Sequence, residues 1–115
     1  MLTLADAIEA LTGSRPEAAS RWVITEGSVD SRQVIPGALF VALPGEHVDG
    51  HDFVSAAFER GAVAALVSHE VSSEAPVIDL REPLALEALG VFESLPGGPV
   101  CLLVADPLQA MQQVA

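Results

Sequence analysis

The spacing of apolar residues along this chain switches between the period of a helix and that of a strand, and these switches predict its secondary structure. Near the N-terminus, apolar residues recur at the three- and four-residue intervals of one helix face, namely at Leu4, Ala7, Ile8 and Leu11. Thr3 and Asp6 resemble a capping box at the start of this helix, and Gly13 is suited to end it. The chain is therefore expected to begin with an amphipathic helix.

Short apolar runs farther along the chain predict β-strands. They cover 22–25, 39–43, 62–68, 77–80 and 100–104, and 29–34 is expected to be extended as it leads into a Pro-Gly turn. The run at 39–43 is apolar on both faces, which is typical of a strand inside a parallel sheet. Helices are predicted between these runs, over 53–60, over 83–93 and from Leu108 onward.

The alternation of strands with helices indicates an α/β fold with a mostly parallel sheet. The 115 residues are most simply one domain, which is long enough to bury a core. The last predicted helix is still running at Ala115, and no C-terminal cap follows it. We therefore expect the chain to be a domain cut from a longer protein at its boundary.

Charge and composition exclude several classes of function. The net charge is −11 and the five arginines are scattered, so no nucleic-acid partner is expected. The chain has no lysine, so it cannot form a P-loop of the type GxxxxGK[ST] or a lysine Schiff base. It has no apolar run of about 20 residues, no secretory signal pattern and a single cysteine, Cys101. We expect a cytoplasmic protein with no membrane contact and no disulfide within the chain.

The stretch from Asp30 to Phe53 carries most of the candidate chemistry, because a polar triplet, a turn, a buried strand and a Gly-rich acidic loop precede a helix there. In the triplet, the Ser31 hydroxyl could hydrogen-bond a ligand, and Arg32 could reach a phosphate or a carboxylate. The alternative is a turn in which Asp30 accepts hydrogen bonds from nearby backbone N–H groups and pairs with Arg32. The whole stretch suits a backbone-lined pocket for a small anionic ligand, with no obvious nucleophile–base pair.

The loop over 45–52, GEHVDGHD, has glycines that permit a close approach of its backbone to a ligand. The helix that follows is expected to point free N–H groups and its positive dipole end at this loop, which would attract an anion. The loop also contains potential metal ligands, namely His47, Asp49, His51 and Asp52. Their spacing matches no zinc or calcium motif, and Asp49 or Asp52 is needed as a helix cap, so no metal is predicted.

Three further side chains are expected to have structural roles. His69 lies just past a strand and is expected to be solvated. Cys101 lies in a strand of valines and leucines, which favours a buried structural thiol over a nucleophile. Trp22 is expected in the core, with an interdomain contact as the alternative.

Three segments, DSRQVIPGALFVAL, PGEHVDGHDF and AAFERGAVAALV, together resemble the amino-terminal domain of the Mur ligases, which add amino acids to the UDP-N-acetylmuramoyl peptide of bacterial cell walls. The similarity covers 1–68 well and the final strand and helix fairly. The opening MLTLADAIEAL, the ending VADPLQAMQQVA and the GEHVDGHDF loop lean toward the ligase that adds D-alanyl-D-alanine, and the ligase that adds the third peptide residue is the near alternative. The predicted strand and helix over 77–99 depart from the family pattern, as an insertion or a changed sheet edge would.

The resemblance implies a three-layer α/β/α domain with a mixed, mostly parallel sheet, over 1–115, that binds the uridine diphosphate end of a UDP-N-acetylmuramoyl peptide. It implies that other domains of an ATP-dependent, amide-bond-forming ligase bind ATP and Mg²⁺ and bring in D-alanyl-D-alanine, so no catalytic residue and no cofactor are expected here. The predicted substrate-binding residues lie in the strand end and the loop: Val29, Ser31, Arg32, Glu46, His47, Val48 and Asp49. Ser31 would hydrogen-bond the nucleotide, the loop would surround the uracil, and Asp49 would shape the pocket.

Two other classes of function are also considered. A stand-alone ligand-binding or interaction module would reuse the fold without any ligase, and a lysine-bearing P-loop farther along the chain would exclude it. A metal-dependent hydrolase would be built on His47, Asp49 and His51, and metal analysis of the folded protein would test it.

Overall fold

The strands of the protein form one parallel sheet. The structure is a computed structural model that describes residues 2–13, 15–43, 49–69, 71, 75–81 and 99–114. Within these residues the strands are β1 (Gly27–Ser28), β2 (Leu39–Val41), β3 (Ala64–Val67), β4 (Val77–Asp79) and β5 (Val100–Leu103). They lie in the order β1-β2-β3-β5-β4, and each pair of neighbours is parallel. The predicted α/β class with a parallel sheet is confirmed.

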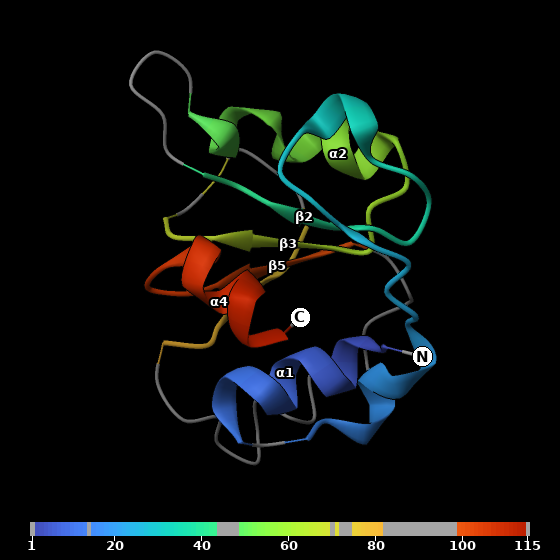
Figure 1. Ribbon diagram of the computed structural model, residues 1–115, viewed down its shortest axis with the longest axis vertical. Helices are drawn as coiled ribbons and strands as arrows, with labels where there is room; N and C mark the ends of the chain where they lie inside the picture. Colours follow the sequence, from blue (N-terminus) through green and yellow to red (C-terminus); the bar gives the residue numbers. More distant parts are fainter. Residues whose placement is uncertain are drawn as a thin grey trace.

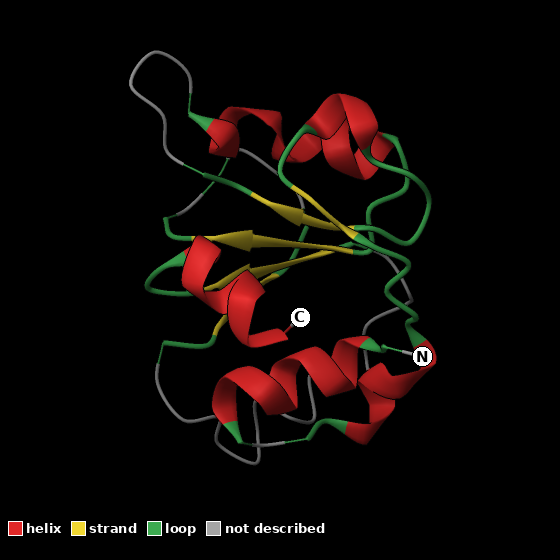
Figure 2. Ribbon diagram, in the orientation of Figure 1, coloured by secondary structure: helices red, strands yellow, loops and turns green. Residues whose placement is uncertain are grey.

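Helices cover both faces of this sheet and so complete three layers (Figure 1). One face carries α2 (Val54–Glu59), which follows the 3₁₀ turn η3 (Gly50–Phe53). The other face carries α1 (Leu4–Thr12) and α4 (Pro107–Val114), which contact each other (Figure 2). The three-layer arrangement implied by the family resemblance is therefore present.

Side chains of the inner strands alternate between the two helical layers. In β2, Leu39 and Val41 belong to the core cluster beside α1 and α4, whereas Phe40 belongs to the cluster beside α2. In β5, Leu102 and Cys101 divide between the same two clusters. Because both faces are covered, these strands are apolar throughout, as the sequence of 39–43 predicts.

The predicted capping box fixes the start of α1. Asp6 N donates to Thr3 Oγ1 at 3.2 Å, and Thr3 N donates to Asp6 Oδ2 at 2.8 Å. Arg15 Nη1 also donates to Asp6 Oδ1, at 2.7 Å. The Arg15 guanidinium and then the Thr3 donors lower the pKa of Asp6 from 3.8 to about 2. Gly13, with a φ of 79°, ends the helix, and its N–H donates to Glu9 O at 2.8 Å.

The predicted strand at 22–25 is wrong. Ile24 N donates to Leu2 O at 2.8 Å, and Thr3 and Val23 form an isolated antiparallel bridge. Ile24 is buried in the core cluster that includes α1 residues, and Trp22 packs half-buried against it, so the run contributes to the core without joining the sheet. Pairing with β2 falls instead on Gly27–Ser28, where the sequence predicts only a break.

The segment at 29–34 is also not extended along its length. Ser31–Gln33 form a 3₁₀ turn, η2, whose N-cap is Asp30. The Asp30 side chain accepts a hydrogen bond from Arg32 N, and this local bond competes with strand pairing. The polar triplet therefore forms a turn instead of extending the strand.

The remaining strands are predicted correctly, and each is one to three residues shorter in the structure. The extra strand predicted at 77–80 is β4, which pairs with β5 at one edge of the sheet. The helix predicted over 83–93 lies outside the described residues. Among the helices that the structure describes, none is long and apolar enough to cross a membrane.

We expect Asp6→Asn to lower the free energy of unfolding at neutral pH, where the ionised carboxylate accepts hydrogen bonds from Thr3 and Arg15. Because the pKa of Asp6 falls from 3.8 to about 2 on folding, its stabilising effect is present above pH 3.8 and is lost as the pH falls toward 2. Urea denaturation followed by circular dichroism should therefore show a flatter acid profile for the variant than for the wild type.

The matched control is Glu9→Gln, which removes another carboxylate of α1. Glu9 is half-exposed and reaches Arg15 at 3.2 Å, and exposed pairs of this kind stabilise proteins by only about 0–1 kcal/mol. It should leave the acid profile close to that of the wild type. Equal flattening in both variants would contradict the role assigned to Asp6.

The Cys101 thiol is expected to be unreactive in the folded protein. Its side chain is fully buried in β5, and this burial raises the pKa of the thiol to about 11. Since the thiolate is the reactive form, a thiol-specific alkylating reagent at neutral pH should modify Cys101 only after denaturation. Mass spectrometry would detect the adduct, and rapid alkylation of the native protein would contradict the burial.

Candidate functional site

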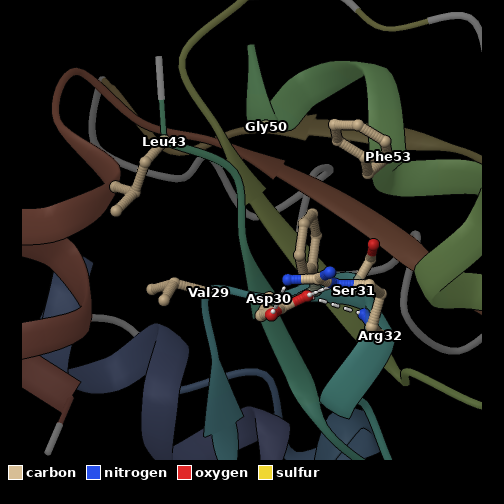
Figure 3. Close-up of a pocket in the computed structure, with 8 residues that line it drawn as sticks. Val29, Asp30, Ser31, Arg32, Leu43, Gly50 and Phe53 are labelled. Atoms are coloured by element: carbon tan, nitrogen blue, oxygen red, sulfur yellow. Dashed lines mark hydrogen bonds and ion pairs between the residues drawn. The ribbon is translucent and has the colours of Figure 1, made fainter. Parts of the chain in front are cut away.

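A pocket opens at the carboxyl ends of β1 and β2, the edge at which open α/β sheets bind their ligands. Its volume is about 520 Å³, which suits a small organic ligand. Its walls are the turn after β1, β2 with its end, and the turn before α2, with the lining residues Val29, Asp30, Ser31, Arg32, Phe40, Leu43, Gly50 and Phe53. Figure 3 shows Val29 and the polar triplet on one side of the pocket, and Leu43, Gly50 and Phe53 on the other.

The polar wall of the pocket is a turn held by one ion pair. Asp30 Oδ1 accepts hydrogen bonds from Arg32 N at 2.9 Å and from Arg32 Nε at 3.1 Å, and Asp30 Oδ2 accepts one from Nη2 at 3.0 Å. This is the turn that the alternative interpretation of the triplet predicts. The pairing fixes the plane of the guanidinium, while 83% of the Arg32 side chain stays exposed.

The other groups of the pocket offer one hydroxyl and an apolar surface. Within the part of the chain that the structure describes, the Ser31 hydroxyl has no hydrogen-bond partner, and in Figure 3 it points toward the side on which Phe53 lies. Val29 is 50% exposed and Phe53 is 40% exposed. The pocket can therefore combine a hydrogen bond, an ion pair and an apolar contact on the same ligand.

Two arginines lower the pKa of Asp30. Hydrogen bonds from Arg32 lower the pKa of Asp30, and the more distant charge of Arg60 lowers it further. Asp30 in turn raises the pKa of Arg32. The Asp30 carboxylate thus lies near two guanidinium groups, and the Arg32 group keeps its positive charge at this end of the pocket.

The apolar wall includes a close contact between two backbone segments, Leu43 and Gly50, which we call the loop neck. Gly50 N donates to Leu43 O at 2.8 Å. A Cβ atom on residue 50 would lie 2.7 Å from Leu43 N and 2.8 Å from Leu43 O, so only glycine permits this contact. The neck joins the end of β2 to the turn before α2.

Directly after the neck, His51 is the buried polar side chain in the described part of the core. Its Nε2 accepts a hydrogen bond from Ser68 N at 2.9 Å, so the ring proton resides on Nδ1, which lies 2.6 Å from Asp49 Oδ1. His69 Nε2 donates to Asp49 Oδ2 at 3.1 Å, and the two imidazoles stack with centroids 3.7 Å apart. His69 is exposed, as expected of a solvated side chain, but it also makes these two contacts, which the sequence does not predict.

The expectation of free amide groups at the start of this helix is also wrong. Gly50 N donates to Leu43 O, His51 N to Asp49 Oδ1 at 3.0 Å, and Asp52 N to Asp49 O at 3.0 Å. The helix end is thus satisfied by an aspartate cap, as the capping alternative predicts. The hydrogen bond from His51 N, then the side chain of His51 and then that of His69, lower the pKa of Asp49 from 3.8 to about 2.

The structure gives a physical reason against a ready three-ligand metal site at this point. Ligand atoms of Asp49, His51 and His69 do lie within 4.8 Å of one another. However, both ring nitrogens of His51 already bond to protein groups, and a metal ion would have to displace the Ser68 amide or the Asp49 carboxylate. The cluster is better described as a hydrogen-bonded support for the loop than as a metal centre.

Three of the predicted substrate residues, Val29, Ser31 and Arg32, lie together in the pocket. Asp49 lies beside the loop neck, with its carboxylate turned to the histidines. The other predicted contacts, at 46–48, lie outside the described residues. Sequence reasoning missed the lining residues from β2 and η3: Phe40, Leu43, Gly50 and Phe53.

The missed residues follow from topology more than from residue type. Leu43 and Gly50 are where the end of a buried parallel strand meets the next helix, and such ends converge on the ligand-binding edge. The predicted strand at 39–43 and the predicted helix beginning at Phe53 indicate where this edge lies. Their apolar side chains, however, are typical of core positions and do not by themselves indicate a pocket.

Comparison with known proteins places the chain in a family. Residues 23–90 match the model of the Mur ligase family, catalytic domain. The chain is 42% identical over 88 residues to the UDP-N-acetylmuramoyl-tripeptide–D-alanyl-D-alanine ligase of Treponema pallidum (strain Nichols), which covers 76% of this chain and 16% of that protein. It is 43% identical over 79 residues to the UDP-N-acetylmuramoyl-L-alanyl-D-glutamate–2,6-diaminopimelate ligase of Listeria monocytogenes serotype 4b (strain F2365), which covers 69% of this chain and 16% of that protein.

Solved structures agree on the fold. A crystal structure of MurF from Acinetobacter baumannii superposes with a TM-score of 0.59 and 23% identity, over 96% of this chain and 19% of that one. The chain therefore spans about a sixth to a fifth of the length of the proteins that it matches. Because the family match covers more than half of its residues, the chain belongs to the Mur ligase family.

Proposed function

We propose that this chain, over 1–115, is the UDP-binding first domain of a ligase that adds D-alanyl-D-alanine to a UDP-N-acetylmuramoyl tripeptide in peptidoglycan synthesis. The observation that carries the proposal is the pocket at the carboxyl ends of β1 and β2, which gathers Val29, Ser31 and Arg32. Family membership supports the choice of ligand, since the relatives from Treponema and Listeria have UDP-N-acetylmuramoyl compounds in their names.

The pocket walls match the parts of a nucleotide. Phe53 and Val29 offer exposed apolar surface for the flat uracil base, and stacking of a base on an aromatic ring contributes about 1–3 kcal/mol. Ser31 offers a hydroxyl for the base or the ribose. Arg32, already held in plane by Asp30, offers its guanidinium to the diphosphate.

The loop that leaves the neck is proposed to complete this site. Glu46, His47 and Val48 follow Leu43 along the chain, and their contact with the uracil stays a prediction. Asp49 would shape the loop through its cap on η3 and its hydrogen bonds to the histidines, without touching the nucleotide.

The chemistry of ligation would be carried by other parts of the protein. The chain contains no lysine, so the lysine of an ATP-binding P-loop, the Mg²⁺ ligands and the D-alanyl-D-alanine site are proposed to lie in other domains. A ligase that adds the third peptide residue is the second candidate, because the Listeria relative with that type of name is as similar as the Treponema one. The cytoplasmic location stays a prediction.

The binding test uses UDP and a pair of matched arginine variants. Arg32 and Arg81 lie in the same kind of turn, since Asp79 accepts hydrogen bonds from Arg81 N at 2.9 Å, Nε at 3.0 Å and Nη2 at 2.8 Å. Arg81 lines a different cavity, at the ends of β4 and β5. Titration of ¹⁵N-labelled protein with UDP should shift the amide signals of Val29, Ser31 and Gly50.

Arg32→Gln should weaken UDP binding about tenfold, since a hydrogen bond to a charged group contributes about 1.5–3 kcal/mol and exposure to water reduces this. Arg81→Gln, which removes the same charge from the same kind of turn, should bind UDP like the wild type. Binding should also weaken as salt is added. UDP shifts confined to residues around Arg81, or equal losses in both variants, would refute the site.

The acceptor substrate is tested on the full-length protein. We expect ATP-dependent phosphate release with UDP-N-acetylmuramoyl tripeptide to require D-alanyl-D-alanine. Release with the corresponding dipeptide substrate and a single amino acid in place of D-alanyl-D-alanine would instead support the second candidate. Activity with neither pair would contradict both assignments.

A further inference from the structure

His51 lies behind the pocket wall and does not line the pocket, yet it joins the segments that form that wall. We propose that His51 is a positioning residue: it ties the loop neck, formed by Leu43 and Gly50, to the carboxyl end of β3, and so sets the wall against which the nucleotide binds. The effect of this tie on binding rests on the function proposed above, whereas its effect on the neck does not.

The first step is that the hydrogen bonds of the His51 ring fix its tautomer. The ring is buried, with 4% of the residue exposed, and its Nε2 faces two donors, Ser68 N at 2.9 Å and Ser68 Oγ at 3.3 Å. A backbone N–H can only donate, so Nε2 is an acceptor and the neutral ring carries its proton on Nδ1. That proton is donated to Asp49 Oδ1 across 2.6 Å. Both ring nitrogens therefore make hydrogen bonds to protein groups.

The second step is where those two ends lead. Ser68 directly follows β3 and lies 17 residues from His51 along the chain, so this bond fixes the loop to the sheet. Asp49 caps η3 and is the last residue of the loop before Gly50. Gly50 thus lies between Asp49, which caps η3, and His51, which is hydrogen-bonded to Ser68. Its N–H donates to Leu43 O at 2.8 Å.

The third step is that the close contact of the neck leaves no room for displacement. Residue 50 approaches the Leu43 backbone so closely that a Cβ atom has no room, so the neck cannot take up a displacement of the ring without opening. On the solvent side, His69 stacks on His51 and bonds the second oxygen of Asp49, which limits rotation of both groups. Leu43 and Gly50 both line the pocket, so an opened neck changes its shape.

The test replaces the ring by side chains that keep one of its two bonds. In His51→Asn, the amide N–H can still donate to Asp49, but nothing reaches Ser68. In His51→Gln, the amide oxygen can still accept from Ser68 N, but the bond from the side chain to Asp49 is lost. His51→Ala loses both, and the two amide variants keep the test valid if the alanine variant does not fold.

The first readout needs no ligand: the hydrogen exchange rate of the Gly50 amide in the 115-residue protein, measured by NMR. We expect exchange about fivefold to tenfold faster in the Asn and Gln variants, as for the loss of one hydrogen bond, and faster still in the alanine variant. The Val63 amide, which donates to Ala38 O at the amino ends of β3 and β2, serves as the internal reference and should keep its rate. Arg81→Gln, in the turn after β4 and outside the pocket, is the control and should resemble the wild type.

The second readout is the dissociation constant for UDP, which should rise about fivefold to tenfold in the Asn and Gln variants and stay unchanged in Arg81→Gln. The ¹⁵N shifts of the wild-type His51 ring should show a proton on Nδ1 and a bare Nε2. A proton on Nε2, or an unchanged Gly50 exchange rate in all His51 variants, would overturn the proposal. Faster Gly50 exchange with unchanged UDP binding would also overturn it, because His51 would then be only structural.

The two proposals fail separately. If the wild-type protein does not bind UDP but the Gly50 amide responds to the His51 variants, the UDP function is refuted and the tie between His51 and the neck is supported. If UDP binds but neither readout responds to the His51 variants, the function stands and the positioning role is refuted.

Discussion

The burial of both faces of the parallel sheet is the constraint on which the rest of this structure depends. Successive residues of β2, β3 and β5 enter opposite core clusters, so no polar side chain fits along these strands. Burying one Val or Leu side chain contributes about 1.5–3 kcal/mol, whereas an exposed ion pair contributes about 0–1 kcal/mol. Packing of small aliphatic side chains thus sets the architecture, and polar groups are confined to the ends of the strands.

The polar groups at the strand ends act mainly by fixing geometry. The pair of Asp30 and Arg32 is exposed and adds little stability, but it holds a guanidinium plane at the edge of the pocket. The buried imidazole of His51 is more constrained, because each ring nitrogen would lose a protein partner if the ring moved. A parallel sheet with short strands can hold a pocket of defined shape because such bonds connect its loops to its strand ends.

The sequence predicts the parallel sheet, its alternation with helices and the capping of α1 because these features depend on local period and on cap residues such as Thr3, whereas the layering of helices on both faces is implied by the family resemblance. It does not predict the position of β1, since the apolar run at 22–25 has the composition of a strand, and only the tertiary contact with α1 diverts it. Within the site, Ser31 and Arg32 are recognisable as polar residues beside a turn. The roles of His51 and His69 depend on a contact across 17 and 20 residues, which no local pattern contains.

The loop neck also separates a segment that can change under selection for a ligand from a sheet that is mainly under selection for stability. Because Leu43 and Gly50 meet directly, the chain between them begins and ends at nearly the same point, and its length is not dictated by the distance between β2 and α2. Each doubling of the length of a flexible loop costs only about 0.6 kcal/mol of closure entropy. Selection for a ligand can therefore act on the sequence and length of 44–48, whereas the sheet and its two cores, apart from pocket residues such as Phe40, are under selection for stability.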